Sequence, residues 1–203
     1  MKKVMVKICG LTNDNDIEAV NLYKPDFVGF VLFFPKSKRN LELVEAKRLM
    51  KLVNAEIKKV AVVVSPSVEQ AMMISDAGFD CIQIHGELNG EIIHNCNIPI
   101  IKAFNVSDLD KYSQYTSIEN IKGFVFDANE PGSGKTFDWN TLKQLPESDK
   151  MVFLSGGLTP DNVRRAIEVV NPDVVDISSG VEYLDKPGKD PEKISNFIRN
   201  ARN

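Results

Sequence analysis

Short apolar runs alternate with helix-like patterns along almost the whole chain, and this alternation constrains the fold more than any other feature of the sequence. Eight runs rich in Val, Ile and Phe are distributed over the 203 residues. They predict strands at 4–8, 27–32, 59–64, 81–84, 98–103, 123–127, 151–154 and 174–177. Several runs are continuously apolar, as expected for parallel strands that helices cover on their outer face.

Helix signals lie between most of these runs. Apolar stripes include Ile17 and Val20 in the first predicted helix and Leu49 and Val53 in the second. The start signals are Asn40 before the second helix, a capping box at Ser67-Val68-Glu69-Gln70, and the pairs Thr159-Pro160 and Asp190-Pro191, each a cap before a Pro at the first helical position. The segment 105–120 is the poorest in apolar periodicity, so the fifth helix is expected to be short or absent.

Regular alternation of strand and helix predicts βαβ units and a parallel sheet. The sheet is either an open doubly wound one or a closed (β/α)8 barrel, and polar residues after many of the strands favour the barrel. Eight units in 203 residues leave about 25 residues each, so we expect one barrel domain over 1–203 with minimal loops.

Composition narrows the class of partner. The formal charge is −3, from 25 basic and 28 acidic residues, so no bulk positive field is available for nucleic acid or an anionic membrane. The longest apolar run, 27–34, is far too short to span a bilayer. The first seven residues lack the apolar stretch of a secretory signal, and three widely spaced cysteines fit a reducing compartment. We therefore expect a cytoplasmic location.

The first strand ends in Lys7-Ile8-Cys9-Gly10. Period-two alternation places Lys7 and Cys9 on one face, which a barrel makes its interior. An ammonium group near Cys9 would increase its thiolate fraction and provide a usable base near neutral pH. Cys81 and Cys96, in contrast, are expected to be small buried hydrophobes.

The sixth strand ends in Asp127 after the apolar residues 124–126. Burial would favour the protonated carboxyl, which could then act as a general acid, although a turn or helix cap is an equally good explanation for an isolated Asp. The loop that follows, 129–136, resembles a nucleotide-binding loop but has Asn129 where Gly is required. We expect it to be a lid over the site instead.

Small residues follow the last two strands, as Ser155-Gly156-Gly157 and Ser178-Ser179-Gly180. Backbone N–H groups there can approach an anion closely, and barrels often bind phosphate at these two loops. Ordinary strand-to-helix turns are the alternative.

Two further strand ends carry candidate ligand-binding residues. Arg39 follows the second strand, and its planar guanidinium can pair with a carboxylate in two places, whereas Lys36 and Lys38 are expected to be solvated. His85 closes the fourth strand, and a His in such a setting is more often structural than catalytic. Two His and scattered Cys give no metal-ligand spacing, so no metal is expected.

Taken together, these segments resemble phosphoribosylanthranilate isomerase of tryptophan biosynthesis over nearly the whole chain. The resemblance rests on Lys7-Ile8-Cys9-Gly10, Pro35-x-Ser37-x-Arg39, Gln83-Ile84-His85-Gly86, Asp127, Gly132-Ser133-Gly134 with Phe137-Asp138-Trp139, Gly156-Gly157-Leu158 with Asn162-Val163, and Asp176-x-Ser178-Ser179-Gly180-Val181-Glu182.

The resemblance implies a (β/α)8 barrel and a cofactor-independent Amadori rearrangement of a phosphosugar. Asp127 would be the acid and Cys9 the base, with Lys7 supporting the thiolate. Arg39 would hold the substrate carboxylate. The backbone of Gly157, Ser179 and Gly180 would bind the substrate phosphate, Gly156 and His85 would also contact the substrate, and Asp176 would organise the site. We expect a monomer or a homodimer.

Two other functions remain open. A histidine-pathway phosphosugar isomerase also performs an Amadori rearrangement, but it uses two Asp as acid and base, and Cys9 argues against it. A non-catalytic phosphosugar-binding barrel would lack an acid or a base, and both candidates are present.

Overall fold

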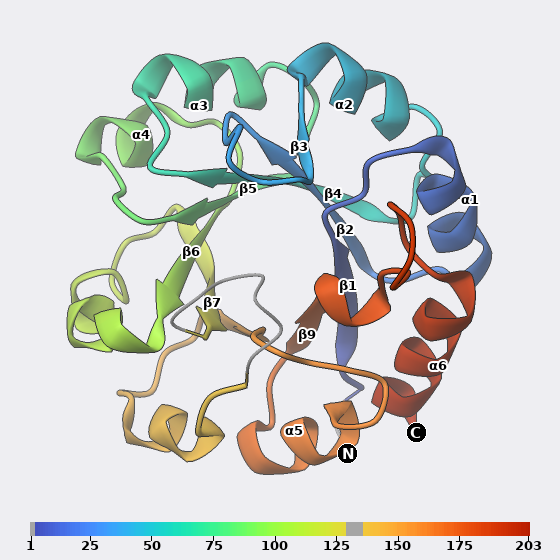
Figure 1. The fold of residues 1–203 in the computed structure, drawn as a ribbon. Coiled ribbons are helices and arrows are strands. Elements are labelled where there is room, and N and C mark those ends of the chain that lie inside the picture. Colours follow the sequence, from blue (N-terminus) through green and yellow to red (C-terminus); the bar gives the residue numbers. More distant parts are fainter. Residues whose placement is uncertain (1–2, 129–135) are drawn as a thin grey trace.

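The computed structural model describes residues 3–128 and 136–203 and forms a closed parallel barrel, seen along its axis in Figure 1. Its strands are β1 (Met5–Cys9), β2 (Phe27–Leu32), β3 (Asn40–Leu41), β4 (Lys58–Val64), β5 (Cys81–His85), β6 (Ile100–Asn105), β7 (Ile121–Asp127), β8 (Met151–Leu154) and β9 (Val174–Ile177). β1 pairs with both β2 and β9, which closes a ring of eight strands, and the two-residue β3 lies outside it, paired with β2. The predicted (β/α)8 barrel and its eight strands are confirmed.

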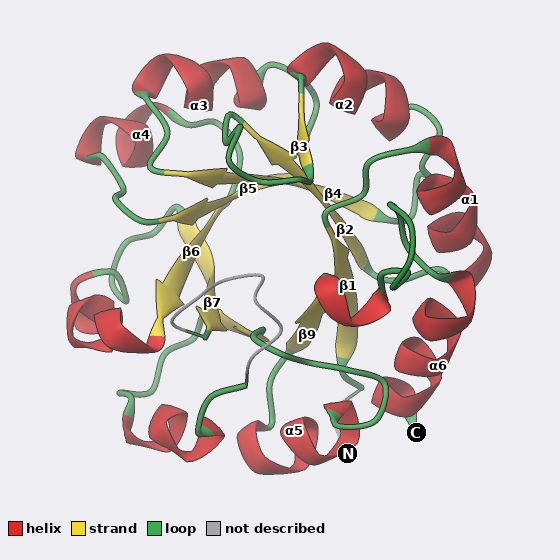
Figure 2. Cartoon of the chain, viewed as in Figure 1, coloured by secondary structure: helices red, strands yellow, loops and turns green. Residues whose placement is uncertain are grey.

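The α-helices surround the ring on its outer side (Figure 2). The α-helices are α1 (Asp14–Tyr23), α2 (Leu43–Met50), α3 (Val68–Ser75), α4 (Gly90–Asn95), α5 (Val163–Val170) and α6 (Pro191–Arg202), and the 3-10 helices are η1 (Val106–Gln114), η2 (Trp139–Gln144) and η3 (Ser179–Val181). None of the helices in the described ranges has both the length and the apolar character needed to cross a bilayer.

The connection between β6 and β7 contains the 3-10 helix η1 where the fifth α-helix would stand, as the weak periodicity predicted. Aromatic packing covers the outer face of the barrel there instead of an apolar helical stripe. Tyr112 contacts Phe124 edge to face at 4.8 Å between ring centroids, and Tyr115 contacts Phe104 at 5.6 Å. Such pairs bury large apolar surfaces with few residues.

Two of the predicted helix starts are confirmed and two are wrong. Ser67 and Gln70 form the reciprocal capping box of α3, and Asp190 caps α6 with Pro191 at its first position. Asn40 does not cap α2, because it pairs in β3 and its side chain accepts from the Phe34 N–H at 2.7 Å. Thr159 does not start α5 either, because the helix begins at Val163 and its N-cap is Asn162. Thr159 lies one turn earlier, where its hydroxyl accepts from the Asn162 N–H at 3.3 Å.

The apolar core lies in two layers separated by the barrel wall. Val6 and Ile8 of β1 belong to the layer between strands and helices, whereas Met5 and Cys9 belong to the barrel interior. The interior is filled by side chains such as Phe27 and Phe153, whose rings meet edge to face at 5.6 Å. The predicted division of β1 into an inner and an outer face is therefore confirmed.

Candidate active site

An open pocket lies at the carboxyl ends of the strands. It is lined by eight of the residues predicted from the sequence, namely Cys9, Arg39, His85, Asp127, Gly156, Gly157, Asp176 and Ser179. Lys7 and Gly180, the other two predicted residues, do not line the pocket, but Lys7 pairs with Asp176 and Gly180 lies against Leu158, both of which do. This arrangement follows from the topology, because all eight strands of a parallel barrel end at the same mouth.

Lys7 and Cys9 lie side by side on the inner face of β1, over Gly29 of β2. A Cβ atom at Gly29 would approach the Cys9 Sγ at 2.8 Å and the Lys7 Nζ at 3.3 Å. Gly29 is the register partner of Cys9, so the missing side chain provides the space that both polar groups occupy. The single glycine inside the apolar run 27–34 is the sequence signal for this contact.

Lys7 forms a buried ion pair with Asp176, its register partner on β9. The Lys7 Nζ lies 2.8 Å from the Asp176 Oδ2, and Lys7 is 0% exposed. Burial alone would lower the pKa of Lys7, but the Asp176 carboxylate and Cys9 raise it above its ordinary value. The Oδ1 atom of Asp176 has no hydrogen-bond partner among the described residues, although it is buried. The ion pair therefore favours the charged form of Lys7, and Asp176 keeps one acceptor available in the pocket wall.

Cys9 differs from the sequence-based expectation. Burial raises the pKa of its thiol, and the nearby Lys7 and Lys189 ammonium groups oppose this shift without cancelling it. Lys7 thus acts in the expected direction, but the expectation of a net increase in the thiolate fraction is wrong. The physical reason is that desolvation of a thiolate in the barrel interior outweighs an ammonium that Asp176 already neutralises.

Asp127 ends β7 at the pocket and is held by its own backbone. Its Oδ1 accepts from the Ala128 N–H at 2.8 Å, and a Cβ atom at Gly156 would lie 3.1 Å from that same oxygen. Burial raises the pKa of Asp127 to about 6, against the opposing effect of the Ala128 hydrogen bond. The carboxyl therefore carries a proton at a far higher pH than an ordinary Asp, as the sequence analysis expected.

The two glycine-rich turns pack directly against each other. Gly156 and Gly157 have φ angles of +83° and +64°, which explains why glycine stands at both positions. A Cβ atom at Gly180 would lie 2.2 Å from the Leu158 carbonyl oxygen, so only glycine allows this approach. Within the described part of the chain, the amide N–H groups of Gly157, Ser179 and Gly180 have no hydrogen-bond acceptor, which leaves them available to an anion.

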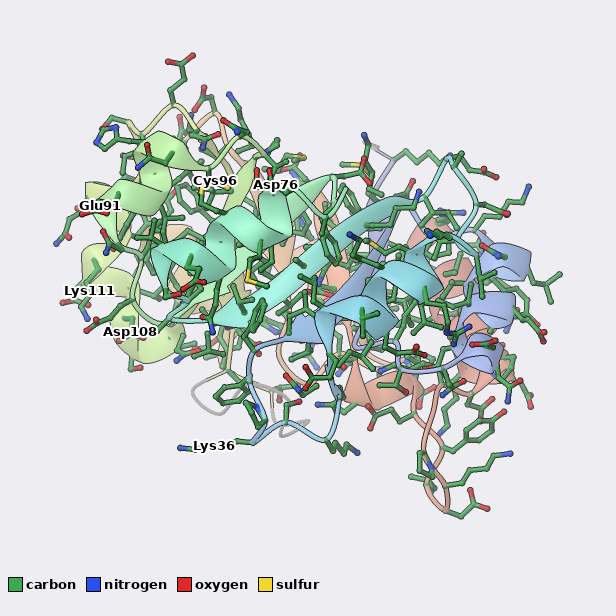
Figure 3. The ribbon with its side chains drawn as sticks, turned by 90° about the horizontal axis from the view of Figure 1, so that it is seen from above. Lys36, Asp76, Glu91, Cys96, Asp108 and Lys111 are labelled. Carbon is green, nitrogen blue, oxygen red and sulfur yellow. The ribbon has the colours of Figure 1, made fainter. Side chains whose placement is uncertain are left out.

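Arg39 is bound by a partner that the sequence analysis missed. Its Nε donates to the Glu182 Oε1 at 2.5 Å, and Lys38 and Lys189 also contact this carboxylate, at 2.8 and 3.2 Å. Lys38 is exposed as expected but is ion-paired. The presence of Glu182 at the end of the motif 176–182 was the available signal. Lys36 extends away from the barrel into open space (Figure 3).

His85 lies beside Gln83 on the inner face of β5. The Gln83 Nε2 and the His85 Nε2 are 2.8 Å apart, and the amide oxygen of Gln83 is buried with no partner in the described ranges. Burial and the charges of Lys7 and Lys102 lower the pKa of His85 to about 3. The imidazole is therefore neutral at physiological pH and can offer a hydrogen bond but no charge.

Two other predictions concern cysteines and the loop after β7. Cys81 and Cys96 are buried, at 6% and 5% exposure, in agreement with their expected role as small hydrophobes. Figure 3 shows Cys96 at the end of the barrel opposite Lys36. The predicted lid falls on residues 129–135, which lie outside the described residues. Among the described residues, no three His, Cys, Asp or Glu side chains form a group that could hold a metal ion.

The closed barrel, with its polar groups gathered at the carboxyl ends of the strands, defines the class: a (β/α)8-barrel enzyme. Comparison with known proteins identifies the family within that class. Residues 6–200 match the family model described as N-(5'phosphoribosyl)anthranilate (PRA) isomerase. The chain therefore belongs to the N-(5'-phosphoribosyl)anthranilate isomerase family.

Individual proteins support this assignment. The chain is 40% identical to the N-(5'-phosphoribosyl)anthranilate isomerase of Clostridium acetobutylicum, and the alignment covers 98% of both chains. It also resembles the crystal structure of phosphoribosyl anthranilate isomerase from Thermotoga maritima, at 35% identity and a TM-score of 0.82, with 98% of both chains covered. A further structure, 34% identical with a TM-score of 0.79 and 98% of both chains covered, is of phosphoribosyl anthranilate isomerase in complex with reduced 1-(o-carboxyphenylamino)-1-deoxyribulose 5-phosphate.

Proposed function

We propose that this chain converts N-(5'-phosphoribosyl)anthranilate to 1-(2-carboxyphenylamino)-1-deoxyribulose 5-phosphate, with Asp127 as general acid and Cys9 as general base. The observation that carries the proposal is the meeting of Cys9, Asp127, Arg39 and the two glycine-rich turns in one pocket. An acid and a base then stand between one site for a carboxylate and another for a phosphate. Binding both ends of a substrate fixes the reacting carbons between the two groups.

The first step is ring opening. Asp127 gives its proton to the ribose ring oxygen, the bond from C1' to that oxygen breaks, and the anilino nitrogen forms a Schiff base with C1'. The buried environment of Asp127 favours the protonated carboxyl that this step consumes. The unpartnered Asp176 Oδ1 is an acceptor for a hydroxyl of the opened sugar.

The second step is proton abstraction. The Cys9 thiolate removes the proton from C2', and the electrons of that bond form an enolamine that tautomerises to the aminoketose. At the end of turnover Asp127 is ionised and Cys9 is a thiol, so one proton must pass from Cys9 to Asp127 through solvent before the next cycle. Lys7 stabilises the transient thiolate through its charge.

Substrate binding uses the remaining groups. The terminal nitrogens of Arg39 pair with the anthranilate carboxylate, and the amides of Gly157, Ser179 and Gly180 hold the phosphate, with Gly156 shaping the turn. His85, neutral and hydrogen-bonded to Gln83, contacts the substrate as a polar wall residue. No part of this proposal requires a cofactor or a metal.

The test compares variants of the proposed base and acid with a variant of a buried cysteine outside the site. Loss of substrate fluorescence measures turnover, and Cys9→Ala and Asp127→Asn should each lower kcat/KM by about 10² to 10⁴ fold, the usual contribution of a general acid or base. Cys96→Ala, at the opposite end of the barrel, should keep full activity. Full activity of either site variant would refute the role of that residue, and an inactive wild type that binds the substrate would favour a binding protein.

The other sequence-based expectations stay proposals. These are a single domain over 1–203, a cytoplasmic location, a monomer or homodimer, and no nucleic-acid or membrane partner. Growth of a tryptophan auxotroph lacking the isomerase, with the wild-type chain supplied and with Cys9→Ala as control, tests the pathway assignment.

A further inference from the structure

A cluster of charged side chains lies behind the carboxylate-binding part of the pocket, and its centre is Glu182. The Glu182 Oε1 accepts from the Arg39 Nε at 2.5 Å and from the Lys189 Nζ at 3.2 Å, while its Oε2 accepts from the Lys38 Nζ at 2.8 Å. The Glu182 side chain is 13% exposed and that of Lys189 is 1% exposed. Both oxygens of this carboxylate are therefore occupied, and Glu182 does not line the pocket.

Arg39 is fixed at two points by this arrangement. Its aliphatic stem lies against Gly10, where a Cβ atom would be 2.5 Å from the Arg39 Cδ, and its Nε is bound to Glu182. Its terminal nitrogens donate to no protein group in the described part of the chain. A guanidinium held through Nε presents its two terminal nitrogens as a fork, the geometry that matches a carboxylate.

Lys189, which is buried, also binds the Glu182 carboxylate. Its Nζ also donates to the Ser178 carbonyl oxygen at 3.1 Å, and the Ser178 hydroxyl donates to the Cys9 carbonyl oxygen at 3.0 Å. Glu182 is thus tied to the loop after β9 and to the end of β1. Burial alone would raise the pKa of Glu182, but the Arg39 hydrogen bond and the cationic charges lower it to about 2. Glu182 is therefore ionised over the whole working range of pH.

The charge balance of the cluster still favours an anion. Arg39, Lys38 and Lys189 contribute three positive charges and Glu182 one negative charge, so the group keeps an excess of cations beside the pocket. Glu182 neutralises part of the repulsion among the three cations. Because Glu182 binds the Nε atom of Arg39, it restricts the direction in which the two terminal nitrogens of Arg39 point. It does not occupy those two nitrogens.

We infer that Glu182 is a positioning residue for substrate recognition: it holds Arg39 through Nε so that the terminal nitrogens of Arg39 face the pocket and bind the carboxylate on the aromatic ring of the substrate. This inference rests on the proposed function, in which Arg39 binds that carboxylate. It assigns to Glu182 an effect on carboxylate recognition alone, and none on the phosphate or the sugar.

The experiment uses two ligands that differ only in the carboxylate. They are reduced 1-(o-carboxyphenylamino)-1-deoxyribulose 5-phosphate and the same compound with an unsubstituted phenylamino group, and calorimetry gives the Kd of each. Glu182→Ala should weaken the first ligand about tenfold, as expected for a misdirected charge-assisted contact, and the second by less than about twofold. Glu182→Gln, which keeps an acceptor for Nε but loses the charge, should fall between wild type and Glu182→Ala.

Arg39→Met shows how much binding is lost when the contact between Arg39 and the ligand carboxylate is itself removed. It should reproduce the selective loss, and Arg39→Met combined with Glu182→Gln should be no weaker than Arg39→Met alone. In turnover, Glu182→Gln should raise KM and leave kcat nearly unchanged, the signature of a lost uniform binding contact. Glu45→Gln, in an exposed pair with Arg48, is the matched control and should not change either Kd.

Equal weakening of both ligands by Glu182→Gln would overturn the inference, because it indicates general loosening of the pocket. Unchanged binding of the carboxylate ligand would also overturn it. If Glu182→Ala does not fold, Glu182→Gln alone decides between these results. The proposed function is judged separately by turnover of the wild type, and binding of the two ligands still tests Glu182 if that turnover is absent.

Discussion

At the scale of single residues, burial moves the two titratable groups of the pocket in the same direction. It raises the pKa of Asp127 to about 6 and raises the pKa of the Cys9 thiol above its ordinary value. The proposed reaction needs the opposite protonation order, with the proton on Asp127 and none on Cys9. The reactive form is therefore a minor tautomer of the singly protonated pair, present wherever the pair carries one proton.

This order predicts the pH dependence of the reaction. Below about pH 6 the pair holds two protons, so kcat/KM should fall with decreasing pH from the pKa of Asp127. Above the raised pKa of Cys9 the pair holds none and the rate should fall again, with a plateau between the two limbs. Initial rates from mildly acidic to strongly alkaline pH check this, and activity that continues to rise below pH 6 would indicate that Asp127 acts as an acid without the thiolate.

Much of the site at this scale could be predicted from the sequence. Cys9, Asp127 and Arg39 end predicted strands or follow them, and the carboxyl ends of parallel strands meet at one mouth. The net pKa direction of Cys9 could not be predicted, because it depends on how deeply the thiol is buried and on how Asp176 pairs with Lys7. Both are consequences of packing in the closed barrel.

At the scale of elements, the loops after β8 and β9 form one unit. Gly180 in the middle of η3 lies against the Leu158 carbonyl with no room for a side chain, and the neighbouring Gly156 and Gly157 need left-handed backbone angles. The amides proposed to bind phosphate come from both loops. Their relative position is consequently fixed by a backbone contact between two segments that follow different strands.

Gly180→Ala should separate these loops. A methyl group 2.2 Å from a backbone oxygen must displace one loop, which should cost about 1 to 3 kcal/mol of unfolding free energy and weaken phosphate-dependent binding. Urea unfolding and the affinity for inorganic phosphate measure the two effects. Gly90→Ala is the control, since a Cβ atom there meets nothing within 4 Å, and it should leave phosphate affinity unchanged. If Gly180→Ala and Gly90→Ala had the same stability and the same phosphate affinity, the contact between Gly180 and the Leu158 carbonyl would not hold the two loops in place.

The start of a helix could be predicted from a capping residue only where no neighbouring strand offered that residue other hydrogen bonds. The capping box at Ser67 and Gln70 formed as predicted because both partners lie within four residues of each other. Asn40 carries the same kind of signal, but β2 offers backbone pairing at that point and the side chain bonds to the Phe34 N–H instead. Capping propensity is thus overridden when a neighbouring strand supplies alternative hydrogen bonds.

At the scale of the whole molecule, the ion pair of Lys7 and Asp176 joins the first and last strands of the barrel. The two side chains are 169 positions apart in the sequence and 2.8 Å apart in the barrel interior. Removing one partner of a buried pair leaves an uncompensated charge, which is far more costly than removing both. The pair therefore connects barrel closure with the electrostatics of Cys9.

A double-mutant cycle tests this connection. Lys7→Met and Asp176→Leu alone should each destabilise the chain by about 3 to 5 kcal/mol, and the variant that combines them should recover most of that loss. Activity should remain low in the two variants that lack Lys7, because Cys9 loses its cationic neighbour in each. Urea denaturation gives the stabilities, with Arg48→Met as an exposed ion-pair control that should change little. Additive losses from the two substitutions would show that the pair does not act as a unit.

The sequence by itself determined the class of fold and the order of the polar strand ends. Period-two alternation and apolar runs are local properties, and the parallel barrel that they specify brings the ends of all eight strands to one mouth. Only the tertiary structure decided which charges meet there. Arg39 and Glu182 are 143 positions apart, and Lys7 and Asp176 are 169 positions apart. Contacts over such separations, and the desolvation that sets the pKa of Cys9 and Asp127, arise only when the barrel closes.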